Sequence, residues 1–307
     1  MLDIRKLRLL RELAHRQTIA AVAEALNYTP SAVSQQLTAL EREAGVPLLE
    51  RGGRRVTLTP AAHTLVGHTE SILAILEQAT ADLARGRAEL TGTLRIGTFP
   101  TAIRTILAPA LVDLSTAHPG LELMVTELDP VLAPGALRAE TLDIALVQDY
   151  DYVPVDDDAA LDAEPFLEEI VYLAEPAAFA EPGPRPTPLA LSARHENPWI
   201  AGTPGTLCHT MTVRACQAAG FTPRIRHHAD DFGAVLELVA AGAGVALVPE
   251  LGARTPPATV ALTPLDTRRR TRIAYRRGTA DHPAIRAART ALRHSATAAR
   301  EGWASAH

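Results

Sequence analysis

Small hydroxyl and amide side chains cluster between residues 29 and 38. Thr29 followed by Pro30 is a strong helix start, because threonine caps free backbone amides and proline fits the first helical position. When Val33, Leu37 and Leu40 face inward, the outward face carries Pro30, Ser31, Ser34, Gln35 and Thr38. Such side chains can hydrogen-bond base edges and phosphates in a DNA groove without steric bulk. A polar outer face is also typical of ordinary helical hairpins, so both interpretations stand at this point.

Two more helices are expected to position this segment. Leucines recur at helical spacing between residues 7 and 13, and a short Ala-rich helix is expected from about Thr18 to Leu26. Gly45 ends the third helix after about Glu43. Two short helices joined by a tight turn predict a helix-turn-helix, with Thr18 as a further candidate DNA contact.

The next segment, VPLLERGGRRVTLTP, contains two short strand-like stretches around a Gly52–Gly53 turn. It predicts a hairpin, or wing, in which Arg51, Arg54 and Arg55 contact DNA phosphates, which positions a protein but does not read sequence. The formal net charge is −5, yet residues 1–60 carry nine Lys/Arg against six Asp/Glu, whereas residues 91–307 carry nineteen against twenty-five. Any polyanion contact is therefore expected at the N-terminal end.

A long Ala/Leu-rich helix is expected from Thr59 to about Arg87. Beyond it, short apolar strands alternate with helical stretches. The expected strands are 94–98, 121–126, 144–147, 170–173, 199–201, 225–229, 245–248 and 273–275. This alternation predicts parallel sheets covered on both faces. Two Pro-rich segments, 175–188 and 255–264, are expected to be turns or crossovers.

The N-terminal part resembles the signature of LysR-type transcriptional regulators. The resemblance lies in TIAAVAEALNYTPSAVSQQLTALEREAGVPLLERGGRRVTLTPAA, residues 18–62, and the later strand–helix pattern is similar to that family's effector domain. Thr29–Ser31 stands in place of the family's usual Ser-Gln-Pro, Leu49 in place of its wing phenylalanine, and Ala62 in place of its glycine. These departures concern operator preference.

The resemblance implies an all-α winged helix-turn-helix over 1–58, a linker and dimerisation helix over 59–90, and an α/β effector-binding domain over 91–307. That domain would be two-lobed and similar to periplasmic binding proteins, with lobe I at about 91–163 and 264–300 and lobe II at about 164–263. The implied function is a sequence-specific transcription regulator controlled by a small-molecule effector. The implied partners are double-stranded DNA, the effector, other copies of the chain in a homodimer or homotetramer, and RNA polymerase.

The sequence Thr-Phe-Pro-Thr at residues 98–101 stands where a strand passes into a helix. Open α/β sheets bind ligands beyond the carboxyl ends of their strands, so Thr98, Phe99 and Thr101 are candidate effector contacts. Capping of its own helix is the alternative for Thr101. The resemblance implies a facing wall from residues 199–203 and the strand end near 229–232, which adds Trp199, Gly202, Thr203 and Phe232 as candidates. It also implies Asp129 and Gln148 as further contacts. A tryptophan beside an apolar strand is more often part of the core, which is the alternative for Trp199.

Other charged groups have simpler interpretations than a second site. Residues 149–169 hold nine carboxylates and no basic residue, without the spacing or glycine of a calcium loop, so a solvated loop is expected. The arginines between residues 268 and 277 resemble a second nucleic-acid patch, but they flank a strand, so a charged edge strand is at least as good an interpretation. The histidines and cysteines lack zinc-ligand spacing, so no metal or cofactor is expected.

Cys208 and Cys216 resemble the switch cysteines of peroxide-sensing LysR-type regulators, and a redox-responsive regulator using this pair is the alternative function. On one helix their separation of eight residues corresponds to a rise of about 12 Å. Bridged cysteines have Cα atoms within about 7 Å, so a disulfide would require local unfolding. Buried, reduced thiols are the simpler expectation.

No nucleophile elbow, phosphate loop or pair of catalytic carboxylates is visible, so an enzyme is not expected. Charges interrupt the first residues, which lack a signal-peptide core, and no uninterrupted apolar stretch approaches about 18 residues. A cytoplasmic location without a membrane span is therefore expected, which disfavours a secreted solute-binding protein with the same two-lobed fold. The sequence leaves open the effector, the operator and the choice between activation and repression.

Overall fold

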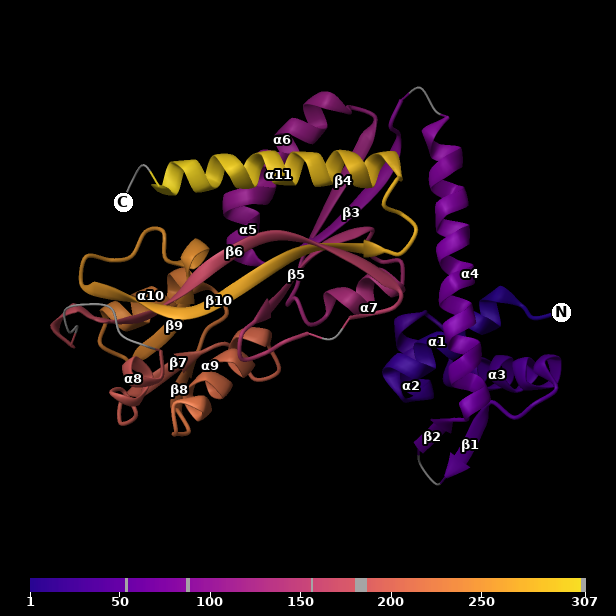
Figure 1. The fold of residues 1–307 in the computed structure, drawn as a ribbon, viewed down its shortest axis with the longest axis horizontal. Helices are drawn as coiled ribbons and strands as arrows, with labels where there is room; N and C mark the ends of the chain where they lie inside the picture. Colours follow the sequence, from indigo (N-terminus) through magenta and orange to yellow (C-terminus); the bar gives the residue numbers. More distant parts are fainter. Residues whose placement is uncertain (53–54, 87–88, 156, 180–186, 305–307) are drawn as a thin grey trace.

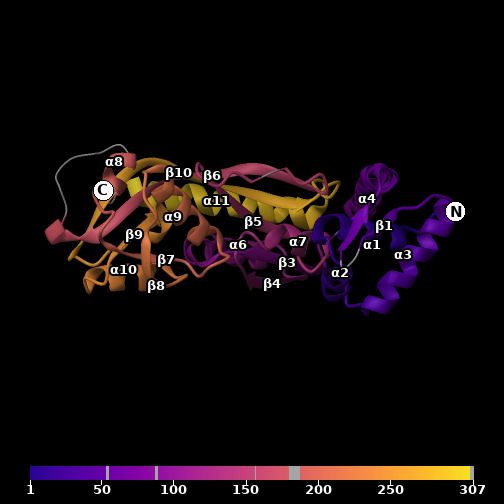
Figure 2. The same ribbon diagram turned by 90° about the horizontal axis from the view of Figure 1, so that it is seen from below.

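The computed structural model describes residues 1–52, 55–86, 89–155, 157–179 and 187–304. A helical N-terminal domain, one long helix and an α/β part follow each other along the chain (Figure 1). The molecule is elongated, with the N-terminal domain at one end and the second half of the α/β part at the other (Figure 2).

Three helices and a hairpin form the N-terminal domain. They are α1 (Ile4–Arg16), α2 (Ile19–Ala25), α3 (Pro30–Ala44), β1 (Leu49–Gly52) and β2 (Arg55–Leu58). Leu10, Val22 and Val33, one from each helix, are fully buried in a common core. Gly45 ends α3 with a φ of 70°, a left-handed conformation that glycine adopts without strain. The predicted helix-turn-helix with a hairpin after it is confirmed.

The long helix α4 (Pro60–Arg85) begins where the sequence predicts. The Thr59 hydroxyl accepts a hydrogen bond from the Ala62 amide at 3.2 Å, which caps the first turn. Ile75 and Leu83 are 65% and 79% exposed on this helix. An apolar surface of this kind on a long helix is typical of a helix that pairs with a partner.

One eight-stranded sheet runs through the whole α/β part. Its strands are β3 (Gly92–Thr98), β4 (Leu121–Glu127), β5 (Ile144–Tyr150), β6 (Leu161–Pro176), β7 (Pro198–Ala201), β8 (Arg224–His228), β9 (Val245–Pro249) and β10 (Val260–Arg276). The strand order is β4-β3-β5-β10-β6-β9-β7-β8. We call the half built on β3, β4 and β5 lobe I and the half built on β7, β8 and β9 lobe II; the long strands β6 and β10 join them (Figure 1).

Helices cover both faces of each lobe. Lobe I carries α5 (Pro100–Ala102), a π-helical turn (Ile103–Leu107), α6 (Ala108–Ala117), α7 (Ala133–Arg138) and α11 (Pro283–Ala304). Lobe II carries α8 (Thr187–Ser192), α9 (Leu207–Ala218) and α10 (Phe232–Ala240), and short 3-10 turns span Ala177–Phe179 and Glu250–Gly252. In lobe I, α6 and α11 pack on one face of the sheet and α7 on the other; in lobe II, α9 and α10 lie on opposite faces.

The expectation of parallel sheets is correct within each lobe and wrong for the strands between them. β3 pairs in parallel with β4 and β5, and β7 with β8 and β9. In contrast, β10 runs antiparallel to β5 and β6, and β6 antiparallel to β9. One strand carries the chain from lobe I to lobe II and the other brings it back, so the two must run in opposite directions. Part of the predicted Pro-rich turn 255–264 consequently belongs to β10.

Within the described part of the chain, no helix has the length and apolar character needed to cross a bilayer. The same residues contain no cluster of three or more side chains suited to holding a metal ion.

Candidate DNA interface and effector cleft

The N-terminus of α3 projects short polar side chains from the N-terminal domain. The Thr29 hydroxyl accepts from the Ala32 amide at 3.2 Å and lies 3.1 Å from the Ser31 hydroxyl. Ser31 and Gln35 are exposed, and Ser34 and Thr38 are partly exposed. The inward face is closed by Val33, Leu37 and Leu40, which are at most 1% exposed. This orientation agrees with the predicted groove-facing row, whose contact with DNA stays a prediction.

Two more candidate DNA contacts lie close to this helix. Thr18 is exposed and caps α2 by accepting from the Ala21 amide at 3.2 Å. The wing is tied to α3 because Glu41 Oε1 accepts from the Leu48 and Leu49 amides at 2.9 and 3.0 Å. Among the predicted wing arginines, Arg54 lies outside the described residues, as do the side chains of Arg51 and Arg55. Their phosphate contacts remain a prediction.

A cleft of about 290 Å³ opens between the two lobes. Its walls are formed by Phe99, Pro100, Thr101, Glu127, Leu128, Asp129, Pro130, Gln148, Thr206, Cys208, Asp230, Phe232 and Arg269. Five predicted effector residues are therefore brought together here: Phe99, Thr101, Asp129, Gln148 and Phe232. A sixth, Thr98, is 1% exposed and lies at the end of β3, directly before the wall.

Several polar groups at the cleft are buried without a hydrogen-bond partner. They are Thr101 Oγ1 and Gln148 Nε2 in the wall itself and Thr98 Oγ1 directly before it. The Thr101 hydroxyl caps no helix, so the capping alternative for this residue is wrong. Burying an unpaired polar group costs roughly 1–3 kcal/mol. An occupant that supplies matching polar atoms would remove that cost.

Besides Thr98, three of the predicted contacts do not line the cleft. Trp199 is 0% exposed in the core of lobe II, where its Nε1 donates to the Arg194 carbonyl at 3.2 Å, so its prediction as an effector contact is wrong. Gly202 and Thr203 lie beside Asp230, which does line the cleft. The Thr203 amide and hydroxyl each donate to the Asp230 carboxylate at 2.7 Å. Gly202 leaves room beside them, because a Cβ there would lie 2.6 Å from the Thr206 hydroxyl.

Arg269 forms part of the cleft wall and was not predicted. Its guanidinium donates to Glu169 at 2.8 and 2.9 Å, and the two residues are 1% and 2% exposed. The guanidinium also lies 5.1 Å from the centroid of the Phe99 ring. Burial opposes the charge, but Glu169 raises the pKa of Arg269 above its ordinary value. β10 is a central strand, so the expectation of a charged edge strand is wrong.

The expectation of a solvated loop holds for only part of the acidic segment 149–169. Residues 149–150 lie in β5 and residues 161–169 in β6, next to the arginines of β10, whereas Asp157 between the two strands is 99% exposed. The ion pairs formed by its described residues include Asp149 with Arg270 and Arg272, Asp151 with Arg270, Asp158 with Arg138, Glu164 with Arg289, and Glu169 with Arg269. The runs of opposite charge neutralise each other across neighbouring strands.

Two polar contacts cross the cleft between the lobes. Asp129 of lobe I accepts from the Leu207 amide at the start of α9 at 3.3 Å. Arg104 of lobe I donates to Asp231 of lobe II at 2.7 Å. Partial burial alone would raise the pKa of Asp231, but the hydrogen bond from Arg104 and those from backbone amides lower it. Both contacts lie where relative movement of the lobes would break them.

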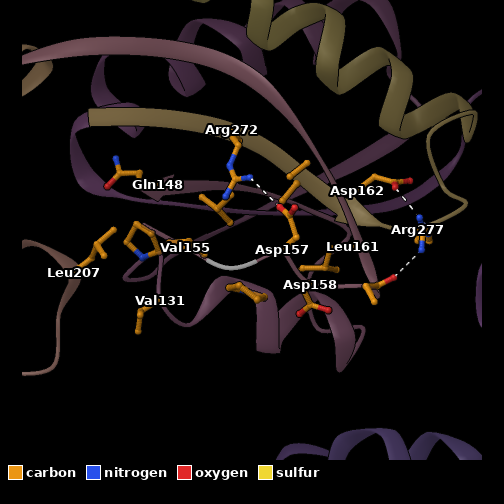
Figure 3. A pocket seen from close by; sticks show the side chains of 16 residues that line it. Val131, Gln148, Val155, Asp157, Asp158, Leu161, Asp162, Leu207, Arg272 and Arg277 are labelled. Atoms are coloured by element: carbon orange, nitrogen blue, oxygen red, sulfur yellow. Dashed lines mark hydrogen bonds and ion pairs between the residues drawn. The ribbon is translucent and has the colours of Figure 1, made fainter. Parts of the chain in front are cut away.

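A second cavity of about 420 Å³ lies on the α7 side of the sheet and shares Pro130 and Gln148 with the cleft. Figure 3 shows Arg272 directed toward Asp157, and Arg277 beside Asp162. Most other wall residues are apolar, among them Val131 and Leu161. Apart from Arg272 Nε and the shared Gln148, no side-chain atom that lines this cavity is buried without a hydrogen bond in the part of the chain described. Both spaces therefore have two lining side chains with such an atom, and the interlobe cleft is the better candidate for a ligand site because it also gathers five of the predicted effector contacts.

The N-terminal domain contacts lobe I directly. Arg11 on α1 donates to the carbonyl of Arg138 on α7 at 2.9 Å. Glu12, also on α1, is 0% exposed and lies 3.7 Å from Arg138 Nε. Arg138 in turn binds Asp158, which lines the second cavity. These charged groups connect the N-terminal domain to lobe I within one chain.

Two domain families match almost the whole chain. Residues 4–63 match the family described as bacterial regulatory helix-turn-helix protein, lysR family. Residues 87–297 match the LysR substrate binding domain. The chain belongs to the LysR family of transcriptional regulators.

Relatives of this LysR-family chain are regulators too. The chain is 31% identical over 252 residues to the HTH-type transcriptional regulator TfdS of Cupriavidus pinatubonensis, covering 81% of this chain and 82% of that protein. It is 29% identical over 238 residues to a probable hydrogen peroxide-inducible genes activator of Mycobacterium avium, covering 77% and 74%. A mutant of OxyR from Corynebacterium glutamicum with hydrogen peroxide bound shares the fold, with a TM-score of 0.60 at 24% identity over 100% of this chain and 96% of that one.

Both cysteines of this LysR-family chain lie on α9. Cys216 is buried in the core of lobe II, and burial raises its pKa to about 12. Cys208 lines the cleft, where its sulfur lies 3.7 Å from the Tyr150 hydroxyl. Burial raises the pKa of Cys208, and the nearby Asp129 and Asp230 add to this, although Tyr150 and Arg269 act in the opposite direction. Both thiols are therefore protonated at neutral pH.

Proposed function

We propose that this LysR-family regulator reads duplex DNA with the N-terminus of α3 and responds to a small molecule bound between its lobes. The observation that carries the proposal is the outward row of exposed Ser31, partly exposed Ser34 and exposed Gln35 on a capped helix inside the family's helix-turn-helix segment. Hydroxyl and amide groups of this kind can contact base edges when the helix enters the major groove. The wing arginines would supply phosphate contacts.

The effector is assigned to the interlobe cleft. The cleft gathers Phe99, Thr101 and Gln148, and it holds the buried hydroxyl and amide groups that lack partners. A ligand that contacts both lobes would favour one relative arrangement of them, which is the requirement for a ligand-driven switch. The contact between α1 and α7 gives lobe I a direct physical link to the DNA-reading domain.

Self-association is assigned to α4, whose apolar side chains Ile72, Ile75, Leu76 and Leu83 are between 41% and 79% exposed. A symmetric pair of chains would place two α3 helices on one DNA duplex, as two-fold related half-sites require. Assembly of such pairs into a homotetramer, contact with RNA polymerase and a cytoplasmic location are further parts of the proposal, and membership of the LysR family supports them.

The redox-responsive alternative is favoured by the name of the Mycobacterium avium relative and by the position of Cys208 in the cleft. Two observations speak against it. A peroxide-reactive cysteine needs a lowered pKa, whereas the pKa of Cys208 is raised. Its potential partner Cys216 lies on the same regular helix, which keeps the two sulfur atoms apart. Ligand binding is therefore the better proposal.

Footprinting tests the proposal with the full-length chain. The DNA upstream of the protein's own gene is incubated with the purified protein and digested with a nuclease. We expect a protected site that shows up above the non-specific background and weakens as salt is raised, because phosphate contacts release counterions. If the correctly folded protein protects no site in this DNA or in the DNA of neighbouring genes, the proposed function is overturned.

A further inference from the structure

The interlobe cleft has a one-sided charge. Three carboxylates line it: Glu127 and Asp129 from lobe I and Asp230 from lobe II. The one cationic side chain on its described wall is Arg269, and Glu169 neutralises that charge with two hydrogen bonds. A cleft lined by one sign of charge concentrates ions of the opposite sign. The cleft therefore attracts cations and repels carboxylates.

The carboxylates retain capacity to bind a further donor. Asp230 accepts from the amide and hydroxyl of Thr203, and Asp129 accepts from two backbone amides, one of them at 3.0 Å and the other at 3.3 Å. An ionised carboxylate has about four acceptor positions, so each keeps unfilled lone pairs. Their field also reaches Cys208, where both aspartates raise the pKa of the thiol.

The cleft also holds buried neutral polar groups. Thr101 and Gln148 are each 3% exposed, line the cleft and carry a side-chain atom without a hydrogen-bond partner. A hydroxyl can donate or accept, and an amide offers both kinds of atom. These groups suit a hydroxyl or carbonyl on the ligand, at a distance from its charge.

A neighbouring ion pair shows that a cation can join the two lobes beside the cleft. Arg104 of lobe I binds Asp231 of lobe II at 2.7 Å, directly beside the cleft. Asp129 and Asp230 line the same cleft, one carboxylate on each lobe, and Arg269, already paired with Glu169, is the one cationic side chain on the described wall. Two like charges on opposite walls favour separation of the lobes, and a cation between them reverses the sign of that interaction.

We propose that the effector is a small organic amine, whose ammonium group bridges Asp129 and Asp230 and whose polar remainder meets Thr101 and Gln148. The proposal rests on the effector cleft of the proposed function and adds the chemical class of its ligand. Binding of the amine draws the lobes together, because each lobe contributes one of its anionic partners. A carboxylate effector is excluded by the same charges.

Matched pairs of probes test this on the full-length protein by isothermal titration calorimetry. The pairs are putrescine against succinate, and tyramine against para-hydroxyphenylacetate; the members of each pair have similar size but opposite charge. We expect an amine to bind and its matched acid to fail. Asp129→Asn and Asp230→Asn should each weaken amine binding by about tenfold or more, because each removes one charge from the pair. Glu196→Gln removes a carboxylate that is 89% exposed and outside the cleft, and should leave the affinity unchanged.

Three results would overturn the inference: the acids bind and the amines do not, neither set binds, or Glu196→Gln weakens binding as much as the two aspartate variants. The DNA footprint, recorded on the same preparations without ligand, separates this failure from that of the proposed function. A retained footprint with acid binding that Thr101→Val weakens would keep the effector cleft and remove only the amine.

Discussion

The buried ion pair between Arg269 and Glu169 stabilises the wall of the cleft. Both are almost fully buried, and Glu169 also accepts from the Leu251 amide at 2.8 Å. Removing one partner of a buried pair leaves an uncompensated charge, at a cost of about 3–5 kcal/mol. We therefore expect Glu169→Gln to lower the free energy of unfolding by about that amount, measured by urea denaturation followed by circular dichroism.

The adjacent residue provides the control. Glu168 is 58% exposed and faces Arg268 and Arg270 at 3.8 and 3.3 Å. Exposed pairs contribute about 0–1 kcal/mol, so Glu168→Gln should change stability little. If both variants lose the same free energy of unfolding, the burial of Glu169 does not make its ion pair more stabilising than an exposed one.

Cys208 yields a prediction about pH. Because its pKa is raised, the reactive thiolate should be scarce near neutrality and should grow as pH rises toward that pKa. Alkylation of Cys208 by iodoacetamide, followed by peptide mass spectrometry, should be slower at pH 7 than that of a free cysteine peptide. It should accelerate through the alkaline range, and hydrogen peroxide should produce no Cys208–Cys216 disulfide. Rapid alkylation at pH 7 would revive the redox alternative.

At the residue scale, local patterns predict well only what local interactions decide. The Thr29–Pro30 start and the inward row of Val33, Leu37 and Leu40 follow from helix capping and periodicity, and the structure has both. The burial of Arg269 depends on which strands flank β10, and that pairing joins residues 100 positions apart. Trp199 is similar, since nothing adjacent in sequence shows which side of its short strand is covered.

At the scale of elements, the two long strands show where proline signals mislead. Pro264 lies in β10 opposite Tyr172, although proline usually interrupts a central strand. The register shifts directly after it, between Pro264 and Arg268, so the strand accommodates the missing amide at an irregularity. A second shift follows between Thr271 and Arg272. The sequence shows the prolines but not the bulges, so turns were the natural expectation.

The element α4 carries the prediction on assembly. Ile75 is 65% exposed and Leu83 79% exposed on this helix. If chains pair through α4, Ile75→Asp combined with Leu83→Asp would place charges in an apolar interface, at a cost that exceeds the contact energy. Sedimentation velocity should then report a monomer where the wild type is a dimer or larger.

The control for this prediction is Leu189→Asp, at a residue of α8 that is 62% exposed and far from α4. It should leave the sedimentation coefficient unchanged. A double α4 variant that still sediments with the wild type would place the interface elsewhere.

At the scale of the whole molecule, the junction between α1, α4 and α7 joins the DNA-reading domain to lobe I. Arg276 also spans it, donating to Glu77 of α4 at 2.7 Å and to the Leu142 carbonyl at 2.8 Å. Arg138→Ala would leave Asp158 without its cation and remove a neighbour of Glu12. We expect faster amide hydrogen exchange in α1 and α7 and a loss of about 1–3 kcal/mol in stability.

Arg8→Ala is the control, because it tests whether removal of any charged residue at the junction has the effects expected of Arg138→Ala. Arg8 binds Glu140 at 2.7 Å, but the two side chains are 39% and 42% exposed. This variant should cost less than about 1 kcal/mol and leave exchange in α7 near the wild-type level. If Arg138→Ala behaves in the same way, the junction does not hold the two parts together.

The general architecture could be predicted from the resemblance of residues 18–62 and from the alternation of strands and helices. The crossing of β6 and β10 and the contact of α1 with α7 could not. Both join segments more than 80 residues apart, and nothing in a local pattern records such pairings. Local patterns and the resemblance therefore predict five residues that the cleft brings together, and the strand end near residues 229–232 that holds Asp230, but they do not predict Arg269 in its wall.

The central claim is that α3 reads DNA, and one titration tests it most directly. Fluorescence anisotropy of a labelled duplex carrying the protected site is measured with wild type, Gln35→Ala and Gln217→Ala, the last an exposed glutamine on α9 in lobe II. A good base contact contributes about 1–3 kcal/mol, so Gln35→Ala should bind at least about fivefold more weakly, while Gln217→Ala binds like the wild type. Equal affinity for all three proteins would contradict the assignment of α3 as the reading helix.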